Sequence, residues 1–133
     1  MTGQVLNEAA GSRRDPSGCL PLLATITLRG ASGARYPFGV QPGVDDLPHL
    51  GAVYCLSTRL VHVNGICQVR PVYAGQTADL GGRIAAHCRE GRLRRHRANA
   101  ICVYLEENEF IRQGIVRDLV RELRLSCLGR PQG

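Results

Sequence analysis

Residues 51–57 read GAVYCLS and residues 69–76 read VRPVYAGQ, and these two segments decide the fold class. Both are rich in the β-branched and aromatic residues that are typical of strands. Asn64-Gly65 lies between them and is a pair typical of tight turns. We therefore expect two strands joined by a turn, with Pro71 placing the second strand near a sheet edge or at a strand start.

Two further strands and two helices are predicted around this pair. Asp79 is suited to cap a helix that Gly91 ends. Strands are expected over residues 22–28 and 100–105, and a long helix over residues 107–125. The apolar residues at helical spacing in this last helix are Phe110, Ile111, Ile115, Leu119 (or Val116 and Val120) and Leu123. The order of elements predicts an α+β domain with a small, mostly antiparallel sheet flanked by helices.

The chain divides into four parts by composition. Residues 1–18 are polar and are expected to form a flexible leader, and residues 129–133 a loose tail. Residues 19–50 form an N-terminal strand and loop extension. Glycine and proline are so dense after its strand that a loop with at most one short extended piece is expected. Residues 51–128 form the main domain.

The charge of the chain favours acidic partners. Among 133 residues there are 17 basic and 11 acidic ones, a net charge of +6, and every basic residue is an arginine. Codon usage in a GC-rich genome is sufficient to explain the missing lysine. An arginine guanidinium nevertheless matches two phosphate oxygens at once, whatever the reason for its abundance. Nucleic acid is therefore the first expected partner.

Several other classes of protein are disfavoured. No apolar stretch approaches the roughly 20 residues of a membrane helix, and no signal peptide is recognisable, so we expect a cytoplasmic protein without membrane contact. The six cysteines include no C-x-x-C pair, which argues against a zinc finger. They are expected to be reduced and mostly buried in the core. Two Phe, four Tyr and no Trp are too few for a surface that stacks single-stranded bases.

Three short motifs carry the chemistry. The first is Ala52-Val53-Tyr54 and the second is Tyr73-Ala74-Gly75. The third follows on the expected helix and comprises Thr77, Asp79, Leu80, Arg83 and His87. Their order and their placement on strand, strand and helix resemble the GIY-YIG nuclease family over about residues 51–128. The resemblance implies a GIY-YIG-like fold and an endonuclease that hydrolyses DNA phosphodiesters by the attack of water.

The resemblance also implies a role for each site residue. Tyr54 would be the general base, and Tyr73 and His87 would form hydrogen bonds to the nucleophile or the phosphate. Arg83 would bind the scissile phosphate, and its spacing of four from His87 places both on one helix face. Gly75 would let a phosphate approach the backbone closely.

One position departs from the family. Where the family has its metal-binding glutamate this chain has Val116, and Leu128 stands in the place of a later asparagine. Valine cannot ligate a divalent cation. The loss of about 4 kcal/mol of transition-state stabilisation would slow the reaction roughly a thousandfold. No metal ligand is therefore predicted, and Mg²⁺ or Mn²⁺ is an expected cofactor only if the protein is active.

A cluster of arginines follows the helix that carries Arg83. Six of the 17 arginines fall within residues 83–97, opposed only by Glu90. Most of them follow Gly91, so we expect a basic loop that contacts the backbone of DNA, with a merely solvated loop as the alternative. The predicted nucleic-acid-binding residues are Gly75, Thr77, Arg89, Arg92, Arg94, Arg95 and Arg97.

Three functions stay open from the sequence. The first is an endonuclease whose activity is impaired by the missing glutamate. The second is a catalytically inactive module of the same fold that binds nucleic acid, with double-stranded DNA as the expected ligand. The third is a protein-interaction domain with an acidic partner, since a basic surface suits such a partner as well.

Overall fold

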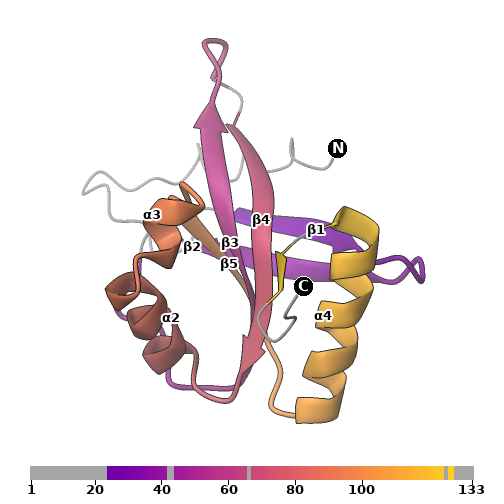
Figure 1. Ribbon diagram of the computed structural model, residues 1–133. Helices are drawn as coiled ribbons and strands as arrows, with labels where there is room; N and C mark the ends of the chain where they lie inside the picture. Colours follow the sequence, from indigo (N-terminus) through magenta and orange to yellow (C-terminus); the bar gives the residue numbers. More distant parts are fainter. Residues whose placement is uncertain (1–23, 42–43, 66, 125, 128–133) are drawn as a thin grey trace.

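The protein folds into a curled sheet with helices on both faces (Figure 1). The computed structural model describes residues 24–41, 44–65, 67–124 and 126–127. The strands follow the order β1-β2-β5-β3-β4-β6, in which the first five are antiparallel and the two-residue β6 is parallel to β4. The predicted α+β class is confirmed. The elements are β1 (Ala24–Arg29), β2 (Arg35–Gln41), β3 (Ala52–Val61), β4 (Cys67–Thr77), α2 (Leu80–Arg89), α3 (Arg92–Arg95), β5 (Ala100–Leu105), α4 (Glu109–Leu123) and β6 (Ser126–Cys127).

The two segments that decided the fold class form the centre of the sheet. β3 pairs with β4 on one side and with β5 on the other. Leu56 lies opposite Tyr73, but Ser57 lies opposite Pro71, so β4 has one extra residue at this point. β6 pairs only with Tyr73 and its neighbour. Pro71 therefore lies beside a bulge, a position at which a strand tolerates proline.

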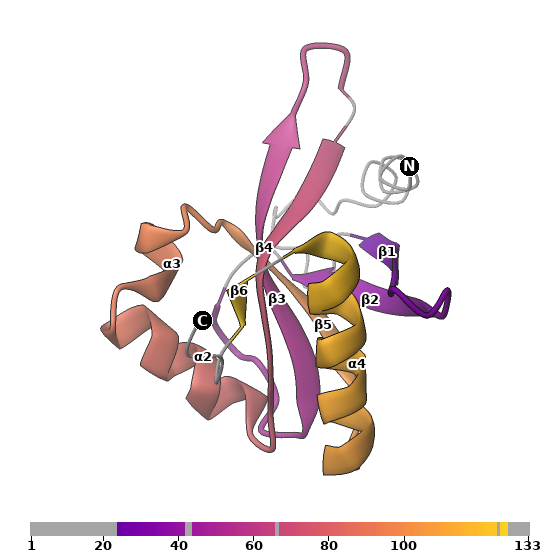
Figure 2. The same ribbon diagram turned by 45° about the vertical axis from the view of Figure 1, so that its right-hand side comes forward.

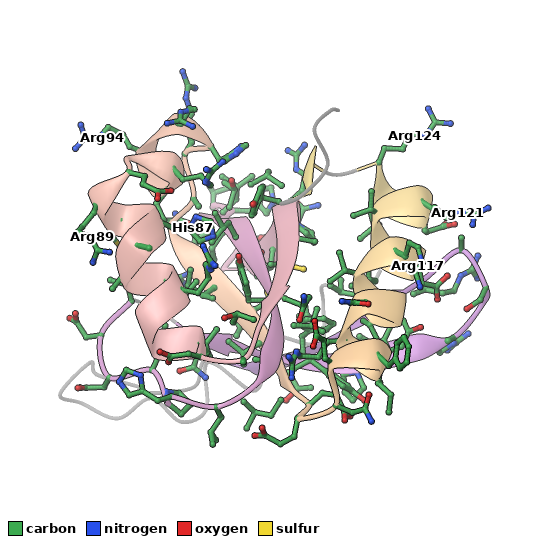
Figure 3. The ribbon with its side chains drawn as sticks, turned by 60° about the horizontal axis from the view of Figure 1, so that its bottom comes forward. His87, Arg89, Arg94, Arg117, Arg121 and Arg124 are labelled. Carbon is green, nitrogen blue, oxygen red and sulfur yellow. The ribbon has the colours of Figure 1, made fainter. Side chains whose placement is uncertain are left out.

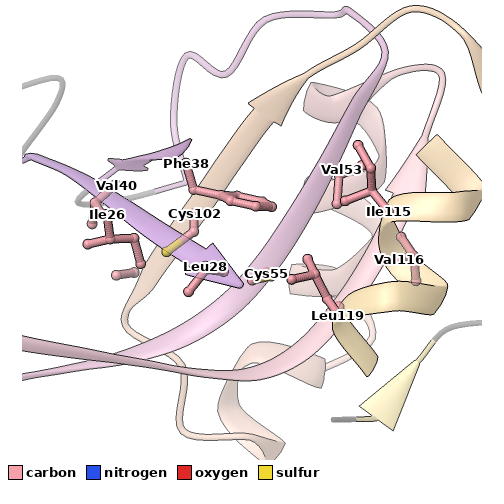
Figure 4. Close-up of a cluster of buried hydrophobic side chains, with 12 residues drawn as sticks. Ile26, Leu28, Phe38, Val40, Val53, Cys55, Cys102, Ile115, Val116 and Leu119 are labelled. Carbon is pink, nitrogen blue, oxygen red and sulfur yellow. The ribbon is translucent and has the colours of Figure 1, made fainter. Parts of the chain in front are cut away.

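The sheet separates two hydrophobic cores. Successive residues of β3 point to opposite faces, so Val53 and Cys55 pack beneath α4, whereas Tyr54 packs beneath α2. Figure 4 shows the first of these cores, to which Val53 of β3 and Val116 of α4 both belong. Figures 1 and 2 show α2 and α3 on one side of the sheet and α4 on the other. Residues carried by α2 and α4 are therefore divided by the sheet.

The loop expected after residue 30 contains a full strand. β2 pairs with β1 along its whole length and with β5 through Gly39–Gln41. Phe38 and Val40 point into the core beneath α4 and are buried. Pro37 lies outside the part of β2 that pairs with β5, so its missing N–H costs nothing there. The sequence predicted a loop with at most one short extended piece, and β2 is that piece, although its seven residues make it longer than expected.

The helices begin close to their predicted positions. The Asp79 carboxylate accepts a hydrogen bond from the Gly82 backbone N–H at 3.1 Å, so Asp79 caps α2 as predicted. Gly91 has φ +73° and ends the helix, which is also as predicted. The residues after it do not form the expected loop, because Arg92–Arg95 make the short helix α3.

The expected apolar face of α4 was partly wrong. Asn108 caps this helix, and Ile115, Val116 and Leu119 pack against the sheet. Phe110 and Ile111 are 79% and 49% exposed. They lie in the first turn of α4, which extends past the edge of the core. Their spacing matched the helix period but gave no information on where the sheet ends.

Three cysteines can be compared with their predicted state. Cys55 and Cys102 are free and buried, as predicted, whereas Cys88 is free but exposed on α2. The leader, Cys19, Leu125 and Leu128, and the tail lie outside the described residues, as do the side chains of Cys67 and Cys127. Within the described ranges no helix has the length and apolar character to span a membrane.

Candidate functional site

The structure brings together three of the four predicted catalytic side chains. Tyr54 of β3, Tyr73 of β4 and His87 of α2 lie on one face of the sheet. The Tyr54 hydroxyl lies 2.7 Å from His87 Nε2, within hydrogen-bond distance. The Tyr73 ring centroid lies 6.4 Å from that of Tyr54 and 5.4 Å from that of His87. We call these three residues the tyrosine–histidine cluster.

The tyrosine–histidine cluster is buried, and burial fixes its protonation. Tyr54 is 0% exposed, and both its burial and the neighbouring Tyr73 raise its pKa. Burial, followed by the positive charges of Arg92 and Arg83, lowers the pKa of His87 to about 4. At neutral pH the tyrosine is therefore protonated and the histidine neutral, so the hydroxyl can donate to Nε2. Nδ1 of His87 is buried and has no hydrogen-bond partner among the described residues.

Arginines of α2 and α3 surround the tyrosine–histidine cluster. The Arg92 guanidinium carbon lies 5.4 Å from the Tyr73 ring centroid, a cation–π distance. Arg83 lies near enough for its charge to affect the pKa values of both Tyr54 and His87. Within the described chain, the buried Nε atoms of Arg83 and Arg92 lack hydrogen-bond partners. Two positively charged guanidinium groups beside a neutral tyrosine and histidine suit an anion such as a phosphate.

The remaining arginines of this stretch lie at the surface. Arg89 is in the last turn of α2, and Arg94 and Arg95 are on α3. Figure 3 shows Arg89 and Arg94 extending away from these helices. Glu90 is the one acidic residue between α2 and the end of β5, and its carboxylate lies 3.5 Å from an Arg92 nitrogen. The predicted basic stretch is therefore a helical surface rather than a loop.

Gly75 accommodates the Tyr54 ring. The two residues lie opposite each other on β4 and β3, and a Cβ at Gly75 would lie 2.6 Å from the Tyr54 hydroxyl oxygen. Gly75 is also buried. The close approach that this glycine allows is therefore that of Tyr54, and not of the phosphate that the sequence analysis expected.

Thr77 lies apart from the arginines. Its hydroxyl accepts a hydrogen bond from the Asp79 backbone N–H at 3.0 Å and so helps to begin α2. The arginines of α3 follow the other end of α2, about 15 Å away along a ten-residue helix. The structure therefore does not place Thr77 with the other predicted nucleic-acid-binding residues.

His96 is a member of the site that the sequence analysis missed. Its ring centroid lies 5.4 Å from that of Tyr73, and burial lowers its pKa, as do Arg92 and Arg95. Tyr73 thus has Arg92 and two histidines around its ring. No spacing in the sequence marked His96, because α3 brings it back towards β4 and that helix was not predicted.

Val116 lies on the opposite face of the sheet from the tyrosine–histidine cluster. It is 6% exposed and packs with Val53 and Cys55 beneath α4. This apolar setting offers no oxygen ligand to a hard cation. Among the described histidine, cysteine, aspartate and glutamate residues, no group of three is placed to hold a metal ion. The described residues therefore do not fit the divalent metal that the resemblance implies.

The buried His87 makes a prediction about acid stability. The free energy of unfolding should fall between about pH 6.5 and 4, because unfolded His87 binds a proton there and folded His87 does not. Urea unfolding at pH 7 and at about pH 4.5 measures this fall in the free energy of unfolding. The fall should be about 2 kcal/mol smaller in His87→Gln than in the wild type, because position 87 then carries no imidazole. His96, Asp79 and Asp118 titrate in both proteins. Equal losses in the two proteins would contradict the prediction.

Comparisons with known proteins add no family assignment. No family model, no curated protein and no solved structure matches the chain. The geometry and charge around Tyr73 therefore carry the functional inference.

Proposed function

We propose that the protein binds the phosphodiester backbone of nucleic acid through a GIY-YIG-like domain. The binding surface consists of the arginines of α2 and α3 together with Arg97, which lies just after α3. We call it the α2–α3 surface, and its members are Arg83, Arg89, Arg92, Arg94, Arg95 and Arg97. The observation that carries the proposal is the pair of half-buried guanidinium groups, those of Arg83 and Arg92, whose positive charges act on the tyrosine–histidine cluster.

The resemblance described above supports the same conclusion. The positions that match the family's two tyrosines and its helix histidine lie together on one face of the sheet. Arginine binds phosphate oxygens in pairs, and each phosphate that it neutralises releases counterions from the nucleic acid. An acidic protein would lack the regular row of phosphates that five arginines on two successive helices, and Arg97 after them, can contact.

Salt dependence tests the proposal. The test variant carries Arg89→Gln, Arg94→Gln and Arg95→Gln. At salt concentrations between about 50 and 200 mM it should bind a short DNA duplex at least about tenfold more weakly than the wild type does. The slope of log affinity against log salt should shrink by about 1 for each phosphate that the variant no longer neutralises. Fluorescence anisotropy with a labelled duplex measures both quantities.

The matched control removes the same charge from the other side of the molecule. Arg117, Arg121 and Arg124 are exposed on or just after α4, away from α2 and α3 (Figure 3). Their replacement by glutamine should change the slope less than the α2–α3 variant does. Binding that is indifferent to salt, or equal losses in the two variants, would contradict the proposal.

Hydrolysis is a second candidate function, favoured by the contact between the Tyr54 hydroxyl and a neutral His87. A neutral histidine can accept a proton, and Arg83 can bind the phosphate that is cleaved. Nicking of a supercoiled plasmid with Mg²⁺ or Mn²⁺, lost in Tyr54→Phe, would favour hydrolysis. Binding is the better-supported function because the Tyr54 hydroxyl is buried and the Val116 side chain lies across the sheet from it.

A further inference from the structure

The ends of β3 and β4 form an arm that projects from the domain. Figures 1 and 2 show these two strands and their turn extending beyond the rest of the sheet. β5 pairs with β3 only as far as Ser57, so residues 58–61 and 67–70 form a two-stranded ribbon. In this ribbon Thr58 lies opposite Arg70 and Val61 opposite Cys67. We call residues 58–70 the arm.

The arm carries apolar side chains where water would surround them. Leu60 is 40% exposed, Val61 is 63% exposed and Val63, in the turn, is fully exposed. No acidic residue occurs from residue 47 to residue 78, whereas Arg70 is exposed on the arm. An isolated ribbon of this kind gains no burial from its apolar side chains. On such a surface the apolar side chains can contact the bases of a nucleic acid, and the basic side chains can contact its phosphates, with no carboxylate to repel them.

Hydrogen bonds hold the base of the arm against the segment that follows α3. The Asn99 side-chain oxygen accepts from the Arg59 backbone N–H at 2.6 Å, and its amide nitrogen donates to the Arg59 carbonyl at 3.2 Å. The Thr58 hydroxyl donates to the Arg97 carbonyl at 3.3 Å. The base of the arm therefore lies against the segment that carries Arg97 of the α2–α3 surface.

We propose that the arm enters the major groove of a B-form DNA duplex whose backbone lies on the α2–α3 surface. This inference rests on the proposed function and deepens it, because it assigns the arm as a second contact with the same nucleic acid. The strands of a ribbon are about 4.8 Å apart, and the major groove is about 12 Å wide and about 8.5 Å deep. Four residues of each strand reach about 13 Å, so the turn can arrive at the base edges.

The apolar turn indicates what the arm would contact in the groove. Thymine presents a methyl group in the major groove, and apolar side chains such as Val61 and Val63 can contact it. The major groove of A-form RNA is too narrow for side chains to enter. The arm therefore favours duplex DNA over duplex RNA.

The test uses a double substitution, Val61→Ser with Val63→Ser, in the full chain. Both side chains are exposed, so the fold should be retained. The wild-type protein should bind a DNA duplex about tenfold more tightly than an RNA duplex of the same sequence. It should also bind less tightly when every thymine is replaced by uracil, which lacks the methyl group. The arm variant should bind DNA about tenfold more weakly than the wild type does, and its RNA affinity should be unchanged. Replacing thymine by uracil should no longer change its affinity for DNA.

Matched controls separate the arm from the α2–α3 surface. Phe110→Ser with Ile111→Ser removes two exposed apolar side chains from α4 and should leave DNA binding unchanged. If the α2–α3 variant loses binding but the arm variant binds DNA as the wild type does, the arm inference fails and the proposed function stands. Equal wild-type affinity for duplex DNA and RNA would also overturn the arm inference. If the α2–α3 variant binds as the wild type does, the proposed function itself fails.

Discussion

Val116→Glu is expected to destabilise the protein by about 4 kcal/mol and to produce no metal-dependent cleavage of DNA. The side chain at this position is 6% exposed in the apolar cluster that contains Val53, Cys55 and Leu119, so a carboxylate there would be largely shielded from water. The tyrosine–histidine cluster lies across the sheet, so the new oxygen atoms would not join it. Urea unfolding measures the first result, and plasmid nicking with Mg²⁺ or Mn²⁺ measures the second.

The variant Val116→Met separates charge from size. Methionine is about as long as glutamate and apolar, and it should cost less than about 1.5 kcal/mol. The difference between the two variants should shrink as the pH falls towards about 4, because a protonated glutamate carries no charge to bury. Nicking that appears in Val116→Glu would show that the glutamate reaches the tyrosine–histidine cluster. It would contradict the placement of position 116 and the cluster on opposite faces of the sheet.

The same position shows what the sequence could predict and what it could not. The helix over residues 109–123 follows from apolar spacing and from a capping asparagine, and both features are local. The face of the sheet that this helix covers is set by the connection from β5 and by the packing of β1 and β2. β2 was expected only as one short extended piece of a loop, so the core beneath α4 could not be assembled from the sequence, and the position of Val116 could not be placed relative to Tyr54.

The candidate site divides in a similar way. Tyr54, Tyr73 and His87 could be grouped because strand pairing and the helix period place them together once a motif marks them. His96 joins them only because α3 forms, and a four-residue helix leaves almost no periodic signal. Thr77 was grouped with the arginines on motif order alone, although a ten-residue helix separates it from them.

Gly75→Ala is expected to cost about 3 kcal/mol of stability. Its new Cβ would lie 2.6 Å from the Tyr54 hydroxyl oxygen and 2.8 Å from the ring carbon that bears it. Tyr54 is buried and bonded to His87, so the ring cannot move without overpacking its neighbours or stretching a buried hydrogen bond. Thermal and urea unfolding measure the loss.

Gly114→Ala is the matched control and should have the opposite sign. Gly114 lies inside α4, and a Cβ there would meet nothing within 4 Å, so the substitution should stabilise the helix by about 0.8 kcal/mol. In a Tyr54→Leu background, where the ring and hydroxyl are gone, Gly75→Ala should cost less by about 1–2 kcal/mol. An undiminished cost in that background would mean that something other than Tyr54 requires the glycine. A diminished cost would mean that the tyrosine of one motif and the glycine of the other are paired by packing, whether or not the protein cleaves its ligand.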